Sequence, residues 1–327
     1  MIAGLDIGYS RTKIVGERGR WDFPSVTGTP DRARFSLNGA QEDLTLVQPY
    51  HVAVGEGAIV QSRHLMRRED REWIESNEYH ALMLAAFSEL TTAKGAELTV
   101  VSGLPIQYYD LDRGALQARL MGEHSLEREG RHRQTLTVTR AAVIPQGFGA
   151  LCAVCLDEKG NIARRDLANG RVGLIDAGGK TTNLLSVNRL AEVGRETASV
   201  NSGAWDVVRA VGRWLADHCP DLELRDHEII EAIKDRGTRY KGRAVDLGAV
   251  IDGAVSPLAD QVIAQATQLW NGAGALDVVL VAGGGAHLVG PRVLAHFDHA
   301  QIIEGDPVFA NAEGYYRFAQ RLARQGA

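Results

Sequence analysis

Residues 173–182, GLIDAGGKTT, follow an apolar run near the middle of the 327-residue chain. The Gly-Lys-Thr within this stretch suggests a P-loop, whose pattern is Gly, four residues, and then Gly-Lys-Ser/Thr. The position where that pattern needs its first glycine holds Leu174, and Gly173 comes one residue too early. Asp176 would also bring a carboxylate to the point where a P-loop curls around phosphate. The spacing therefore excludes a P-loop, and the stretch needs another interpretation.

The same pattern occurs a second time, near the start of the chain. Residues 4–15 read GLDIGYSRTKIV and residues 174–185 read LIDAGGKTTNLL. Each has an apolar strand, Asp-x-Gly, a threonine six residues after the Asp, and a second apolar strand. A repeat at about half the chain length predicts two related domains, each beginning with a β-hairpin. Asp6, Gly8 and Thr12 correspond to Asp176, Gly178 and Thr182.

Such a hairpin can bind phosphate together with its metal. Glycine lets the backbone take positive φ and approach a ligand closely, and successive N–H groups in such a turn form an anion-binding concavity. The Asp at the strand end would hold Mg²⁺, or a water on Mg²⁺, that bridges to phosphate oxygens. Either copy alone could equally be an ordinary hairpin turn. The matched pair favours two turns that clamp a polyphosphate.

The composition excludes several other classes of protein. Hydrophobic residues make up 45% and charged residues 24%, as in ordinary globular proteins. The net charge of −5 argues against a direct nucleic-acid-binding surface. No run approaches the 18 apolar residues of a membrane span, and Asp6 interrupts the N-terminus, so we expect no signal peptide. Three cysteines indicate a reducing cytoplasm.

Apolar periodicity predicts helices and strands in alternation on both sides of the midpoint, which indicates α/β layers around central sheets. Pro257 is a point where the longest helix could break. The expected helices span residues 78–93, 203–217, 226–235, 248–271 and 312–324, and the expected strands span residues 98–105, 135–144 and 276–285.

Taken together, these motifs resemble the actin-like ATPase superfamily, whose fold is shared by actin, sugar kinases and heat-shock chaperone ATPases. The resemblance covers nearly the whole chain. It implies an α/β actin-like fold, in which two related domains with central mixed sheets flank an interdomain nucleotide cleft. The first domain would comprise residues 1–145 and 308–327, and the second residues 146–307.

The resemblance assigns the two hairpins as phosphate motifs. Lys13, seven residues after Asp6, would reach the phosphates as a point charge. Asp6 and Asp176 would act in catalysis and hold the metal through water. The remaining phosphate contacts would come from Gly8, Tyr9 and Ser10 in the first turn and from Gly178, Gly179, Lys180 and Thr181 in the second.

The stretch AAVIPQGFGAL, residues 141–151, resembles the first connecting motif of the superfamily. Gln146 lies where actin-like proteins carry the residue that orients the attacking water. A neutral amide is too weak a base to take a proton, so its role would be positioning, which suits phosphoryl transfer. The alternative is that Gln146 simply begins a helix after Pro145.

The stretch VLVAGGGAHLVGP, residues 279–291, matches the adenosine motif, with Gly283, Gly284 and Gly285 against the nucleotide. A dinucleotide fingerprint would need glycine where Leu288 stands. The second connecting motif matches PVFANAEGYYRFA, residues 307–319, where Ala312 and Gly314 would allow close helix contact.

Three weaker assignments follow from shorter matches. The stretch IIEAIKDRG, residues 229–237, resembles the helix that offers Lys234 and Asp235 to the purine and ribose, although an exposed helix surface explains both. Gly203 would lie near the ribose edge. Cys152 and Cys155 form a C-x-x-C that could serve redox or metal chemistry, but it has no second pair, so we expect two buried core residues.

The stretches GLDIGYSRTK, FPS and FANAEGYY are closest to plasmid-segregation (ParM-like) actins and related archaeal actins. This resemblance implies a cytoplasmic, Mg²⁺-dependent ATPase that forms filaments on nucleotide binding, with GTP as the alternative nucleotide. Its partners would be further copies of the chain and a DNA-bound adaptor, for plasmid segregation or a cytoskeletal role. A small-molecule kinase of the same fold is the main alternative function, and a chaperone-type or scaffold ATPase is a third.

Overall fold

The chain folds into two compact units, of which unit 1 comprises Met1–Arg165 and Phe309–Ala327, and unit 2 Asp166–Val308. The packing therefore groups residues 146–165 with unit 1, whereas the sequence assigned them to the second domain. These residues include a helix that packs closely against the C-terminal helix of unit 1. The domain division at residue 145 stays a prediction. The computed structural model describes residues 1–31, 45–66, 68, 70, 72–128 and 132–325.

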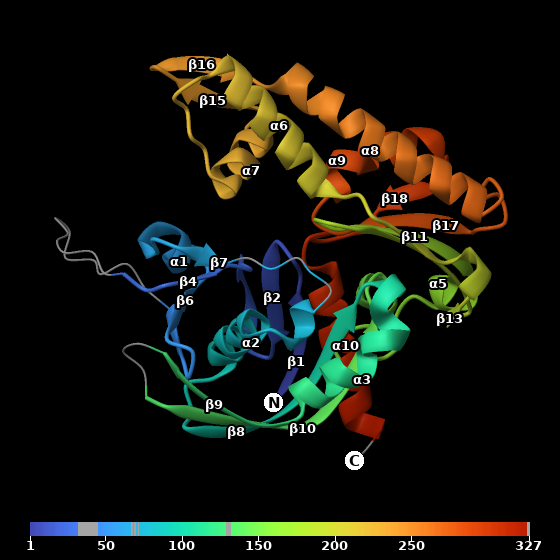
Figure 1. Ribbon diagram of the computed structural model, residues 1–327. Helices are drawn as coiled ribbons and strands as arrows, with labels where there is room; N and C mark the ends of the chain where they lie inside the picture. Colours follow the sequence, from blue (N-terminus) through green and yellow to red (C-terminus); the bar gives the residue numbers. More distant parts are fainter. Residues whose placement is uncertain (32–44, 67, 69, 71, 129–131, 326–327) are drawn as a thin grey trace. The chain divides into compact units, whose positions relative to one another are not determined.

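The sheet of unit 1 is mixed. β1 is parallel to β8, and β8 to β10, while the β1–β2 and β2–β3 pairs are antiparallel. Within the described residues its order is β3-β2-β1-β8-β10-β9-β5-β6-β4-β7 (Figure 1). The strands are β1 (Ile2–Ile7), β2 (Arg11–Gly16), β3 (Gly19–Pro24), β4 (Thr27–Gly28), β5 (Thr45–Gln48), β6 (Val52–Val54), β7 (Leu65–Met66), β8 (Gly95–Leu104), β9 (Gly122–Arg128) and β10 (Gln134–Pro145).

Helices cover both faces of this sheet. Ala3 and Leu5 of β1 share a core with helix α2, while Gly4, which points to the other face, lies against the backbone of α10. Burial on both faces explains why β1 is apolar almost throughout. The helical elements of unit 1 are α1 (Glu56–Gln61), η1 (Trp73–Glu75), α2 (Asn77–Leu90), α3 (Ile106–Leu120), α4 (Phe148–Cys155) and α10 (Ala310–Gln325).

Unit 2 contains a smaller mixed sheet of order β13-β12-β11-β17-β18, with β14 paired to β12, and the two-stranded sheet β15-β16. Helices α6 to α9 (labelled in Figure 1) belong to the same unit. They share one core with the sheet, to which β11 and β17 contribute side chains. Its elements are α5 (Arg165–Asn169), β11 (Arg171–Ala177), β12 (Thr182–Asn188), β13 (Ala191–Glu192), η2 (Gly194–Glu196), β14 (Ala198–Val200), α6 (Ala204–His218), α7 (Asp226–Lys234), β15 (Gly237–Tyr240), β16 (Arg243–Asp246), α8 (Gly248–Leu269), β17 (Val278–Ala282), α9 (Ala286–His296) and β18 (Ala300–Ile302).

The internal repeat of the sequence is present in the structure. In each unit an antiparallel hairpin, β1–β2 or β11–β12, has a first strand that is parallel to a third strand, β8 or β17. The two hairpins also have the same register. Asp6 lies opposite Lys13 in the first hairpin, and Asp176 lies opposite Asn183 in the second.

The expected elements match the observed ones closely, with one informative difference. Helix α8 continues through Pro257 without a break, because Val255, Leu258 and Val262 hold it against the core of unit 2 on both sides of the proline. None of the helices in the described part of the chain combines the length and apolar character that crossing a bilayer requires.

Candidate functional site

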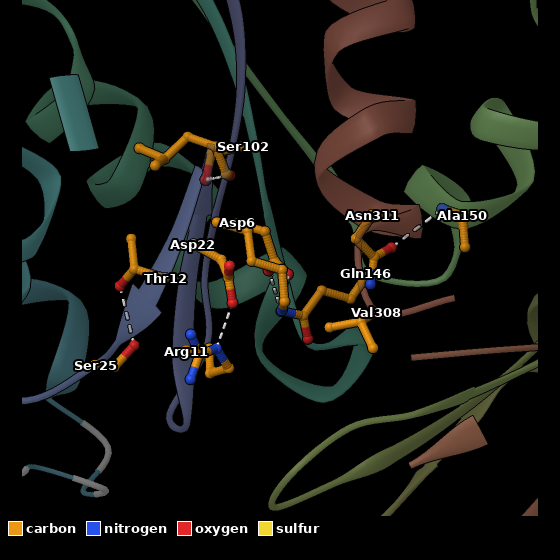
Figure 2. Close-up of polar contacts among 12 residues, drawn as sticks. Asp6, Arg11, Thr12, Asp22, Ser25, Ser102, Gln146, Ala150, Val308 and Asn311 are labelled. Carbon is orange, nitrogen blue, oxygen red and sulfur yellow. Dashed lines mark hydrogen bonds and ion pairs between the residues drawn. The ribbon is translucent and has the colours of Figure 1, made fainter. Parts of the chain in front are cut away.

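Asp6 lies at the carboxyl end of β1 in unit 1, where it is buried. Nζ of Lys13, its neighbour across the hairpin, lies 3.0 Å from Asp6 Oδ2, and both side chains are largely shielded from solvent. Nε2 of Gln146, which is 140 residues away in sequence, donates to Asp6 Oδ1 at 3.3 Å (Figure 2). The fold therefore brings together three of the residues that the sequence assigned to catalysis and phosphate binding.

The two hairpin turns are closed by the same backbone hydrogen bond. In the first turn, the N–H of Gly8 donates to the carbonyl of Arg11 at 3.1 Å. In the second turn, the N–H of Gly178 donates to the carbonyl of Thr181 at 2.9 Å. Since these residues occupy matching positions of the repeat, the turns have equivalent backbone geometry as well as similar sequences.

A buried threonine anchors the first turn to the next part of the chain. Oγ1 of Thr12 and Oγ of Ser25 lie 3.0 Å apart in a buried hydrogen bond, and the N–H of Ser25 donates to the carbonyl of Ser10 at 3.0 Å. The turn is thus fixed at two points, of which Figure 2 shows the contact between Thr12 and Ser25.

Two side chains of the first turn have contacts of their own. The ring of Tyr9 stacks on that of Trp73, with centroids 6.0 Å apart, so we expect Tyr9 to meet a ligand through its backbone. Nε of Arg11 lies 2.5 Å from Asp22 Oδ2. Arg11 was not among the site residues predicted from the sequence. The ion pair of Arg11 with Asp22 on the neighbouring strand holds its guanidinium beside the turn.

In unit 2, Asp176 occupies the matching position at the end of β11, where it is also buried. Gly283, which follows β17, has a φ of +90°, and a Cβ there would lie 2.6 Å from Asp176 Oδ1. The N–H of Gly285 donates to the carbonyl of Ala177 at 2.8 Å. Gly284 is exposed, with no atom near its Cβ position. Two glycines thus let the loop pack on the strand end, while the middle one faces outward.

The second turn caps helix α6. The carbonyls of Gly178 and Gly179 accept hydrogen bonds from the N–H groups of Ala204, at 3.1 Å, and Trp205, at 2.9 Å. A Cβ on Gly203 would lie 2.4 Å from the carbonyl oxygen of Gly179, so this position requires glycine. Because the first N–H groups of a helix have no partner within it, the turn satisfies them.

Asp206 completes this cap. Its Oδ2 accepts from the N–H of Gly203 at 3.0 Å and from Oγ of Ser202 at 2.6 Å. Burial alone would raise the pKa of Asp206, but these hydrogen bonds and the one from Arg209 lower it below its ordinary value. Thr182, the counterpart of Thr12, donates to the carbonyl of Ser202 at 2.9 Å. The segment before α6 therefore holds the second turn rigidly.

Family models match most of this chain in two parts. Residues 4–149 match the N-terminal domain of actin-like proteins, and residues 174–295 match the C-terminal domain of the MreB-like archaeal actin homologues. The chain belongs to the actin-like ATPase superfamily. An archaeal actin homolog of Thermoplasma acidophilum is 26% identical over an alignment of 339 positions, which covers 98% of this chain and 99% of the relative.

Solved actin-like structures share the fold. A crystal structure of an archaeal actin homolog in complex with ADP has a TM-score of 0.78 and 23% identity, and covers 98% of this chain and 99% of its own. A 15-stranded ParM filament from Clostridium botulinum has a TM-score of 0.82 and 21% identity, and also covers 98% of this chain and 99% of its own.

Three further predicted residues of this actin-like chain lie on α7 and in the second turn. Lys234 and Asp235 lie at the end of α7, where Nζ of Lys234 is 2.6 Å from Glu231 Oε1 on the same helix. Lys180 is half-buried in the second turn. The proposed nucleotide contacts of these three residues stay predictions.

The cysteine pair belongs to the core. Cys152 and Cys155 are buried free thiols on α4, and burial raises the pKa of Cys152. Within the described residues, no three His, Cys, Asp or Glu side chains gather as a metal cluster. The structure therefore supports the expected core role of the pair.

The sequence did not predict one residue that contacts this actin-like site. Asn311 stands in the second connecting motif, where only Ala312 and Gly314 had been selected. Its Oδ1 accepts from the N–H groups of Gly147, at 3.0 Å, and Ala150, at 3.1 Å. Figure 2 shows the contact with Ala150. An amide among small residues at the start of a helix was the signal available in the sequence.

Proposed function

We propose that this protein is an ATPase that polymerises on binding ATP and hydrolyses it in the polymer. The observation that carries this proposal is the buried arrangement of Asp6, Lys13 and Gln146 at the end of β1. It combines a carboxylate for a metal, a cation for phosphate and an amide for water. The second turn, with Asp176, repeats the same backbone geometry.

The donor set suits Mg²⁺. This ion prefers oxygen ligands, keeps several waters and is bound through one or two carboxylates together with substrate phosphates. Both oxygens of Asp6 accept hydrogen bonds from nitrogen donors, so this carboxylate would hold the ion through its waters. Asp176 would do the same from the second turn. When bound, the metal supplies positive charge that offsets the charge of the phosphates.

The contact of Gln146 with Asp6 gives its amide a direction. An ionised carboxylate only accepts hydrogen bonds, so the NH₂ group of Gln146 must face Asp6. Its Oε1 is then directed away from the carboxylate and can accept a hydrogen bond from the attacking water. This orientation acts by positioning, which is the main protein contribution to phosphoryl transfer.

The nucleoside end of the ligand would lie against unit 2. Gly283, Gly284 and Gly285 would face the adenosine, with Gly203 near the ribose and with Lys234 and Asp235 at the purine. The ADP complex of a related archaeal actin homolog supports a nucleotide ligand. ATP is proposed over GTP on the resemblance of the adenosine motif.

The polymer would be a filament of head-to-tail contacts, which do not close and therefore propagate. The filament formed by a ParM with the same fold supports this assembly. Loss of the γ-phosphate would weaken the contacts between subunits. We place the filament in the cytoplasm, where a DNA-bound adaptor would attach cargo for segregation.

Hydrolysis and sedimentation test the proposal. Purified protein should pellet with ATP and Mg²⁺, and less so with ADP or without nucleotide. Asp176→Ala should lower phosphate release by at least about 100-fold, whereas Asp298→Ala, an exposed acidic position of the same unit, should leave it unchanged. Hydrolysis by Asp176→Ala at the wild-type rate would remove the assignment. A protein that stays in the supernatant and phosphorylates a small acceptor would be a kinase instead.

A further inference from the structure

We propose that Asn311 is a positioning residue, which holds Gln146 at Asp6 through the backbone of Gly147. This inference rests on the proposed function, since it concerns the water that Gln146 would orient. Asn311 is buried, with 7% of its surface exposed. Its Oδ1 accepts two hydrogen bonds, from the N–H of Gly147 and from the N–H of Ala150.

The backbone around Gln146 is fixed from two sides. On one side, its own N–H donates to the carbonyl of Leu104, the last residue of β8, at 2.8 Å. On the other side, the next N–H, that of Gly147, donates to Asn311. Gly147 has a φ of +86°, and a glycine has little conformational preference of its own. Asn311 therefore supplies the constraint that Gly147 lacks.

Asn311 also satisfies the start of a short helix. Gly147 is the N-cap of α4, and it provides no side chain to accept from the first turn. The Asn311 oxygen accepts in its place, from the N–H of Ala150. A Cβ at Gly149 would lie 2.9 Å from this oxygen, so the glycine leaves room for the contact.

The helix that carries Asn311 also supports Asp6. A Cβ on Gly4, two residues before Asp6 in β1, would lie 2.2 Å from the carbonyl oxygen of Ala312. Helix α10 thus lies directly against β1 at Ala312. The preceding residue, Asn311, contacts the turn that carries Gln146. A single rigid element therefore sets the spacing between the amide of Gln146 and the carboxylate of Asp6.

Steady-state ATPase kinetics test the proposal. Asn311→Leu removes the acceptor and keeps a side chain with the same number of heavy atoms. We expect kcat to fall about 10- to 100-fold, because small misplacements of a positioning group are costly. KM should change less than about 3-fold, because the variant affects the positioning of the water and not the binding of the substrate. Asn311→Asp keeps an oxygen acceptor and should restore kcat to within about 3-fold of wild type. If Asn311→Leu does not fold, Asn311→Ser, whose hydroxyl is too short to reach both N–H groups, is measured in its place.

A double variant separates positioning from an independent effect. If Asn311 acts through Gln146, then adding Asn311→Leu to Gln146→Ala should not lower kcat further. Ser76→Ala is the matched control, because it removes a buried cap of α2 in the same unit and should lower the melting temperature while leaving kcat unchanged.

Two results would overturn the proposal: wild-type kcat in Asn311→Leu with only a lower melting temperature, or a full additional loss of kcat in the double variant. Failure of the proposed function would give a different result from failure of the Asn311 proposal. In that case the wild-type protein and Ser76→Ala would both lack ATPase activity.

Discussion

Buried charge is the main feature of the site at the scale of single residues. Asp6 and Lys13 are directly paired at 3.0 Å and largely shielded from solvent. Removing one partner of a buried pair leaves the other charge without compensation, which costs more than removing both. The pair is thus a structural requirement of unit 1 as well as a proposed ligand site.

We predict that Lys13→Met lowers the free energy of unfolding by about 3 kcal/mol, measured by urea denaturation. Asp6→Asn should destabilise in the same direction. The double variant should lose less than the two single variants together, because no isolated charge remains. Strict additivity would show that the two side chains do not interact in solution.

The buried thiols give a second prediction at this scale. Burial raises the pKa of Cys152, and Cys155 and Cys219 are also buried, so a thiol reagent has little access to any of the three side chains. The folded protein at pH 8 should resist a thiol reagent such as DTNB, and all three cysteines should react after unfolding in denaturant. Rapid reaction of the folded protein would contradict the core role of the pair at Cys152 and Cys155.

Close helix contact decides packing at the scale of elements. Helices α4 and α10 approach so closely that a Cβ on Gly314 would lie 1.6 Å from the carbonyl oxygen of Gly149. This contact involves backbone and cannot relax by a side-chain rotation. It also explains why α4 belongs to unit 1, although a sequence boundary at residue 145 would separate it from α10.

Gly314→Ala should therefore destabilise the protein by about 3 kcal/mol, the upper end of the usual cost of overpacking. Gly253→Ala in α8 is the control, because this exposed helical glycine has no atom within 4 Å of its Cβ position. It should stabilise by about 0.5–1 kcal/mol, through the lower entropy of the unfolded chain and better helix propensity. Thermal and urea unfolding measure both, and equal effects would contradict the packing argument.

A pair of histidines between α2 and β9 should make stability depend on pH. Burial lowers the pKa of His80 to about 4, and nearby Arg119 and His124 act in the same direction. Burial also lowers the pKa of His124. In the unfolded chain both have a pKa of about 6.5. Between about pH 4 and 6.5 the unfolded state therefore binds more protons, and stability is lost as the pH falls.

The free energy of unfolding should thus decrease from pH 7 to pH 4, and the decrease should be shallower in the variant His80→Gln/His124→Gln. Carboxylates contribute to the slope in both proteins, so the difference between the two curves isolates the histidines. His64→Gln, at an exposed position, should retain the wild-type slope. An unchanged slope in the double variant would contradict burial as the cause.

At the scale of the whole molecule, a bound nucleotide should stabilise the folded chain. A ligand that binds only the folded state stabilises it by about 2.7 kcal/mol at 100 times its Kd. At about 2–4 °C per kcal/mol for units of this size, this corresponds to roughly 5–11 °C in melting temperature. Nucleotide binding is therefore measurable without turnover.

We predict that ATP with Mg²⁺ raises the melting temperature by this amount, and that chelation of the metal with EDTA removes most of the rise. The same experiment with GTP compares the two purines directly. Asp6→Asn should melt at the same temperature with and without nucleotide, because its turn has lost the carboxylate. A full shift in that variant would place the ligand elsewhere.

The sequence by itself determined the elements and the family. Hairpins, apolar strands and amphipathic helices are short-range patterns, and the spacing of Asp6, Gly8 and Thr12 recurs at Asp176, Gly178 and Thr182. Because each pattern repeats within a window of about 11–18 residues, it can be read without knowing what it packs against. The same holds for the α/β fold class.

Only the tertiary structure decided which groups meet. Gln146 lies 140 residues from Asp6, and Asn311 lies 164 residues from Gly147, so no local pattern could predict either hydrogen bond. The continuity of α8 through Pro257 likewise depends on the core that holds it. Long-range contacts of this kind depend on the packing of whole elements, because a buried donor or acceptor takes the partner that the fold brings near it.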